Sequence, residues 1–107
     1  MEEQTWKAEI FNTILEKMYQ TYEAKNHDYS VDGKSAFEDG FETFGITSVA
    51  VRLNDKVHRL KAYAKKQEML VDDETVKDTL IDTAVYSVLA LVEIKYREEL
   101  EKLNDVK

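Results

Sequence analysis

The chain has 107 residues, of which 35% are charged and 43% hydrophobic, and it carries a net charge of −7. The length predicts one domain, residues 1–107, and the hydrophobic content excludes a disordered chain. The negative charge disfavours nonspecific binding to duplex nucleic acid, and the absence of cysteine excludes disulfides, thiolate zinc sites and cysteine nucleophiles.

The first ten residues lack the basic segment and apolar run of a secretory signal. No uninterrupted apolar stretch reaches the ~20 residues that span a bilayer. We therefore expect a cytoplasmic protein without a membrane partner. The absence of proline and the presence of only three glycines favour long helices.

The first predicted helix covers about residues 4–25. Its apolar residues recur at steps of three and four, which predicts one core-facing side: Trp6, Ile10, Phe11, Ile14, Met18 and Tyr22. The polar stretch 26–34, with Asp32-Gly33, predicts a loop. Where helix and loop meet lies a compact polar group: Lys25, Asn26, His27, Asp28 and Tyr29. This group either lines a binding site or forms a solvated helix end.

A short helical turn is expected over 35–44, where Phe37, Phe41 and Phe44 are spaced to cover an edge of the core. Gly45 then marks a break, and Thr47 or Ser48 offers a cap for the next helix.

The second long helix is predicted from about residue 48 to about residue 70. Its expected buried stripe consists of Val49, Leu53, Val57, Leu60 and Ala64. Arg52, Lys56 and Arg59 form a basic stripe within roughly 60° at the border of the apolar side. Partly desolvated cations attract phosphate more strongly than exposed ones. Two interpretations remain open: these cations bind a ligand, or they neutralise carboxylates of the third helix.

The third helix is predicted over 75–96, with a solvated helical tail over 97–107. Asp78, Asp82 and Tyr86 share one side of it, and most of its remaining surface is apolar. The short connection 71–74 predicts an antiparallel pairing with the second helix. That pairing would place Arg59 near Asp78 and Arg52 near Tyr86 or Leu89.

These patterns predict an all-α fold. Three main helices form an antiparallel bundle with a short helical turn after the first, and the chain oligomerises, as a dimer or a tetramer, through the apolar third helix. Asp78 and Asp82, one turn apart, are tentative ligands for Mg²⁺, which takes one or two carboxylates together with phosphate oxygens.

Three separated motifs resemble a family of small phage and bacterial proteins named for its association with nucleotide modification. They read Lys-x-x-Asp-Tyr from Lys25, Arg-x-x-x-Lys-x-x-Arg from Arg52 and Asp-Thr-x-x-Asp-x-x-x-Tyr from Asp78, with Gly45 before the second. The chain is also similar to the all-α nucleoside triphosphate pyrophosphatases of MazG and dimeric dUTPase type. Those enzymes bind Mg²⁺ through an ExxE pair and an ExxD pair. Here the ExxE pair is absent, and Thr79 stands where the ExxD glutamate would be.

The resemblance implies a cytoplasmic phage-type protein that binds a nucleotide, or a cyclic or signalling nucleotide, and sequesters it against a host defence. The predicted ligand-binding residues are Lys25, Asn26, Asp28, Tyr29, Arg52, Lys56, Arg59 and Tyr86. All but Asn26 stand at fixed positions of the three motifs, and Asn26 is included because it belongs to the compact polar group at residues 25–29. One alternative is a Mg²⁺-dependent nucleoside triphosphate pyrophosphohydrolase. The second alternative is a non-catalytic helical interaction module whose polar stripe only specifies packing.

Overall fold

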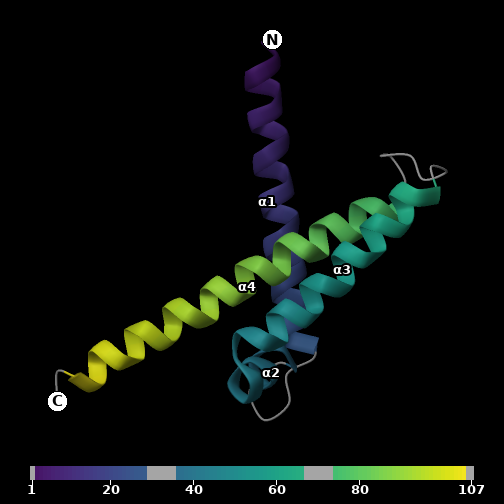
Figure 1. Ribbon diagram of the computed structural model, residues 1–107. Coiled ribbons are helices and arrows are strands. Elements are labelled where there is room, and N and C mark those ends of the chain that lie inside the picture. Colours follow the sequence, from purple (N-terminus) through teal and green to yellow (C-terminus); the bar gives the residue numbers. More distant parts are fainter. Residues whose placement is uncertain (1, 29–35, 67–73, 106–107) are drawn as a thin grey trace. The chain divides into compact units, whose positions relative to one another are not determined.

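The computed structural model describes residues 2–28, 36–66 and 74–105, and these ranges contain four helices and no strand (Figure 1). The chain divides into two compact units, Met1–Ala36 and Phe37–Lys107. The all-α prediction is confirmed. The three-helix bundle stays a prediction, because the first helix belongs to a unit separate from the others. No helix in the described ranges is both long enough and apolar enough to cross a bilayer.

The first unit contributes α1, Glu3–Asp28. The helix starts with Glu3 in its first turn, and Lys7 Nζ lies 2.7 Å from Glu3 Oε1, a favourable one-turn pair. It continues through Asp28, so the loop expected from residue 26 begins later than predicted. The expected core-facing side is also not covered within this unit, since Trp6 and Phe11 are both more than 60% exposed.

The next helix is α2, Ala36–Phe44, which belongs to the second unit from Phe37 onward and is followed by Gly45. Gly45 has φ 63°, a left-handed conformation that side chains rarely adopt, and its N–H donates to the carbonyl of Phe41 at 2.7 Å. The next helix, α3, begins at Ile46, two residues before the predicted start, and runs to Lys66. Ser48 therefore lies inside its first turn, where its hydroxyl donates to the Gly45 carbonyl at 2.9 Å.

The two glycines of this unit predict stability changes of opposite sign. Gly45→Ala should cost about 1–2 kcal/mol, since its left-handed backbone disfavours a Cβ although nothing lies within 4 Å of one. Gly40→Ala should stabilise α2 by about 0.5–1 kcal/mol, because a Cβ there only meets Ser48 Cβ at an ordinary 3.9 Å. Thermal unfolding of both variants measures the difference, and a loss of stability for Gly40→Ala would contradict it.

The last helix, α4, is Glu74–Asp105, and it packs along α3 (Figure 1). The core of the unit is small, with Phe41 of α2, Val49 of α3 and Ala90 of α4 all less than 9% exposed. In the buried part of α4, the hydroxyl of Thr79 donates a hydrogen bond to the carbonyl of Thr75 at 2.8 Å. Thr79 itself is buried, and this bond satisfies its hydroxyl without a partner from another helix.

The outer side of α4 is apolar and exposed. Leu80 is 49% exposed, Val88 47% and Leu91 65%. This exposure is compatible with the predicted self-association through this helix, which stays a prediction.

Candidate functional site

Two polar contacts define how α3 and α4 face each other. Arg52 Nη1 donates to the hydroxyl of Tyr86 at 3.1 Å, and Lys56 Nζ lies 3.5 Å from Asp82 Oδ2. A four-residue step forward along α3 is thus matched by a four-residue step backward along α4. The two helices are antiparallel, and of the two neighbours predicted for Arg52, Tyr86 and Leu89, the structure shows a contact with Tyr86.

The ring of Tyr86 is the centre of this group. Arg52 Cζ lies 5.4 Å from the ring centroid and Lys56 Nζ lies 5.6 Å from it. Phe37 of α2 approaches the same ring, with 5.9 Å between the centroids. Two cations on one aromatic ring are each stabilised by about 0.5–2 kcal/mol, so the ring holds two positive charges close together. We call Arg52, Lys56, Asp82 and Tyr86 the cationic seam.

Lys56 lies inside the contact between the helices rather than beside it, with a side chain only 12% exposed. Beyond Ser48 in the first turn, the less exposed positions of α3 are Val49, Leu53, Lys56, Leu60 and Tyr63. Their steps of four and three residues are those of two helices that pack at a shallow angle. The predicted stripe was wrong at Val57 and Ala64, which are exposed. Lys56 is accommodated because Asp82 of α4 supplies a compensating charge.

The two arginines of the basic stripe differ from Lys56. Arg52 is exposed and oriented by the Tyr86 hydroxyl. Arg59 is 53% exposed, and among the described residues it pairs with Asp55 of its own helix, 3.5 Å away, rather than with a carboxylate of α4. The structure therefore brings Arg52, Lys56, Asp82 and Tyr86 together, whereas Arg59 remains at the surface.

The tentative metal ligands have different surroundings. Asp78 is exposed, whereas the Asp82 side chain is 33% exposed and faces Lys56. No group of three or more acidic or histidine side chains that could hold a metal ion occurs in the described ranges. A Mg²⁺ ion on Asp82 would have to compete with the Lys56 ammonium, so the metal site stays a prediction.

The polar group at the end of α1 belongs to the first unit. Lys25, Asn26 and Asp28 lie in the last turn of this helix, but their side chains are outside the described part of the structure. Tyr29 also lies outside the described residues. Their predicted role in binding is therefore untested.

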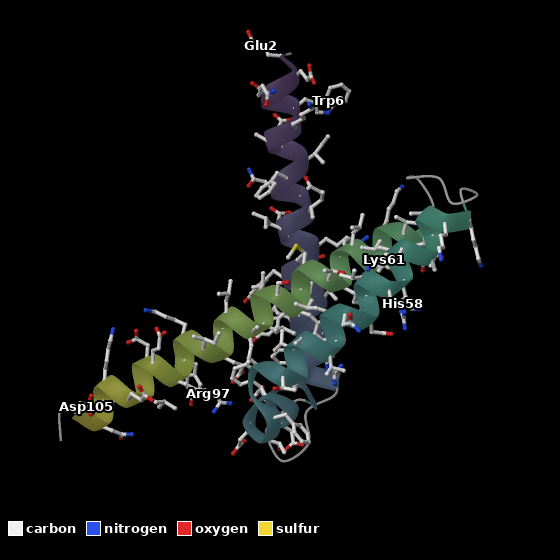
Figure 2. All side chains as sticks on the ribbon, in the orientation of Figure 1. Glu2, Trp6, His58, Lys61, Arg97 and Asp105 are labelled. Atoms are coloured by element: carbon white, nitrogen blue, oxygen red, sulfur yellow. The ribbon has the colours of Figure 1, made fainter. Side chains whose placement is uncertain are left out.

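A further polar contact, which involves Arg97, was not predicted from the sequence. The guanidinium of Arg97 lies 5.0 Å from the Phe41 ring centroid and donates to Glu93 Oε2 at 3.3 Å. Glu93 is only 13% exposed. Residue 97 was assigned to a solvated tail, but the α2-facing side of α4 extends to it (Figure 2). The four-residue spacing of Glu93 and Arg97 was the available signal.

The sequence profile of nucleotide modification associated domain 1 matches residues 25–94, which include the cationic seam. Searches of curated proteins and of solved structures found no match. Because this match covers more than half of the chain, the chain belongs to the family of nucleotide modification associated domain 1.

Proposed function

We propose that this chain binds a nucleotide, or a signal derived from one, with its phosphates at the cationic seam, and that it sequesters this ligand. The observation that carries the proposal is the arrangement of Arg52. Its guanidinium is exposed, and one nitrogen is held by the Tyr86 hydroxyl. A guanidinium with a fixed orientation can direct its remaining N–H groups at a phosphate with less loss of side-chain entropy.

The neighbouring charges support an anionic ligand. Lys56 is largely desolvated and Asp82 offsets its charge, so the exposed cations available to a ligand are Arg52 and Arg59. Arg59 lies two helical turns from Arg52, about 10 Å along the axis. Two exposed guanidiniums at that separation suit a ligand with more than one phosphate. The polar group from Lys25 to Tyr29 falls within the family match and remains a predicted contributor.

Sequestration is favoured over hydrolysis by the position of Asp82. A pyrophosphohydrolase would use Asp78 and Asp82 to hold Mg²⁺, but Asp82 already neutralises Lys56. Hydrolysis is therefore the alternative to be tested. A packing role without a ligand is the second alternative, since an ion pair between helices also specifies their register.

The test is thermal unfolding of the full chain with nucleoside mono-, di- and triphosphates and with cyclic mono- and dinucleotides, each with and without Mg²⁺. A ligand at about 100 times its Kd should stabilise the chain by about 2.7 kcal/mol. Analysis of the same samples for released pyrophosphate distinguishes sequestration from hydrolysis. If no nucleotide raises the melting temperature, the proposal is wrong for that set of ligands.

Arg52→Gln should weaken binding of the nucleotide found in this way by roughly 10- to 150-fold, the equivalent of about 1.5–3 kcal/mol for a charged hydrogen bond. Lys61→Gln is the matched control. It removes the same charge from an exposed position of α3, nine residues on and therefore on the opposite side of the helix. Titration of both variants measures the difference, and equal losses would mean that only the net charge matters.

A further inference from the structure

The guanidinium of Arg52 is the part of the cationic seam whose charge no carboxylate offsets. The other cation of the seam, Lys56, lies 3.5 Å from Asp82. Among the residues that the structure describes, Arg52 forms no ion pair, and its one hydrogen bond goes to the hydroxyl of Tyr86 at 3.1 Å. Arg52 is also exposed. The seam therefore presents one positive charge that is available to an anion.

The hydroxyl of Tyr86 supplies a second donor at the same place. A phenol can accept one hydrogen bond and donate another. This hydroxyl accepts from Arg52 Nη1, and within the described ranges it donates to no protein group. A hydroxyl that accepts from a cation is polarised by it, which strengthens the bond that the hydroxyl donates. We call Arg52 and Tyr86 the donor pair.

The donor pair is held in place before any ligand arrives. The ring of Phe37 approaches the ring of Tyr86, with 5.9 Å between the centroids. Arg52 Cζ and Lys56 Nζ lie 5.4 Å and 5.6 Å from the Tyr86 centroid. Because these contacts fix the ring and its hydroxyl, little conformational entropy is lost when both donors bind the same ligand.

The donor pair has several hydrogen-bond donors and little acceptor capacity, which determines the chemical group that it fits. A guanidinium has no acceptor, and the Tyr86 oxygen already accepts from Arg52. A terminal phosphate, which is a monoester, carries a charge of about −1.5 to −2 near pH 7 and three acceptor oxygens. A phosphodiester carries a smaller charge and fewer free oxygens. Hydrogen bonds to ionised acceptors are the stronger ones, so the pair favours the monoester.

We infer that the donor pair binds a terminal phosphate, and that the ligand is a nucleotide with a free phosphate monoester rather than a cyclic mono- or dinucleotide, whose phosphates are diesters. The Tyr86 hydroxyl donates to one oxygen of this phosphate, and the Arg52 guanidinium donates to another. The inference rests on the proposed function and narrows its class of ligands. It makes Tyr86 a ligand contact in addition to the residue that positions Arg52.

The first measurement compares nucleotides that differ in whether the phosphate is terminal or cyclic. The full chain is titrated with the 5′-monophosphates of the common nucleosides and with the 3′,5′-cyclic monophosphate of each, and calorimetry measures the Kd. The two members of a pair share their base and sugar. The 5′-monophosphate should bind at least about tenfold more tightly, because one further hydrogen bond to a charged group contributes that much.

The second measurement uses Tyr86→Phe, which keeps the ring and removes the hydroxyl. It should weaken binding of the 5′-monophosphate about tenfold and binding of the cyclic nucleotide less, so that the preference between them shrinks. Tyr96→Phe is the matched control, since it makes the same change on a side chain of α4 that is 58% exposed. It should alter neither affinity. Circular dichroism without ligand verifies that both variants keep their helices.

The outcomes separate this inference from the proposed function. If a cyclic nucleotide binds as tightly as its 5′-monophosphate, or more tightly, the inference is overturned while the proposed function stands. If Tyr86→Phe weakens both ligands by the same factor, the hydroxyl only positions Arg52, and the inference is again overturned. If no nucleotide binds, the proposed function and the inference are both wrong. The comparison of ligands needs no variant, so it decides the inference even if Tyr86→Phe fails to fold.

Discussion

Phe41→Ala should destabilise the second unit by about 3–5 kcal/mol, the range for removing a buried aromatic side chain. Phe41 is 8% exposed and packs with Val49 and Ala90, so the change leaves a cavity where three helices meet. It also removes the ring that lies against the Arg97 guanidinium. Small domains lose roughly 4–8 °C of melting temperature for each kcal/mol, so the variant should melt far below the parent chain.

The control for Phe41→Ala is a second phenylalanine of α2. Phe44, three residues further on, is 67% exposed, and its change to alanine should alter stability by about 0.5 kcal/mol or less. Thermal and urea unfolding of the two variants test the placement of α2 on the other helices. Similar losses for both would mean that α2 does not pack as described.

The second large effect is expected for the ion pair of the cationic seam, measured with single and double variants of Lys56 and Asp82. Lys56→Met should cost about 1–3 kcal/mol, less than the loss for a fully buried pair, because Asp82 is 33% exposed. Asp82 also has a further interaction, so the change does not leave this carboxylate without any partner. Adding Asp82→Leu should recover most of the loss, since the double variant leaves no uncompensated charge in the contact.

The same variants separate the two roles of the seam. If the pair only specifies packing, the double variant should be as stable as the parent and bind nucleotides equally. If the seam binds phosphate, the double variant should be stable but bind at least tenfold more weakly. Additive losses from the two single changes, without recovery in the double variant, would show that Lys56 and Asp82 do not interact.

Much of the local structure follows from the sequence alone. The helices lie within a few residues of their predicted positions, because the spacing of apolar residues and the absence of proline leave few alternatives. The sequence also predicted that a helix is interrupted at Gly45, since glycine adopts a left-handed backbone at little cost. The approach of Arg52 to the part of α4 that contains Tyr86 and Leu89 also followed, because a short connection requires neighbouring antiparallel helices, and the structure shows the contact with Tyr86.

Only the tertiary structure decided which side of each helix is covered. The pattern of α3 allowed either Lys56 or Val57 in the contact, since these neighbours are about 100° apart at the edge of a wide apolar side. Lys56 occupies the contact because Asp82 of α4 neutralises its charge. The position of the Arg97 guanidinium against the ring of Phe41, which is more than fifty residues away in the chain, likewise depends on the packing of α2 with α4. The face of α1 is the same case: its spacing predicts a core-facing side, but spacing contains no information about which element covers that side, because apolar burial is not directional.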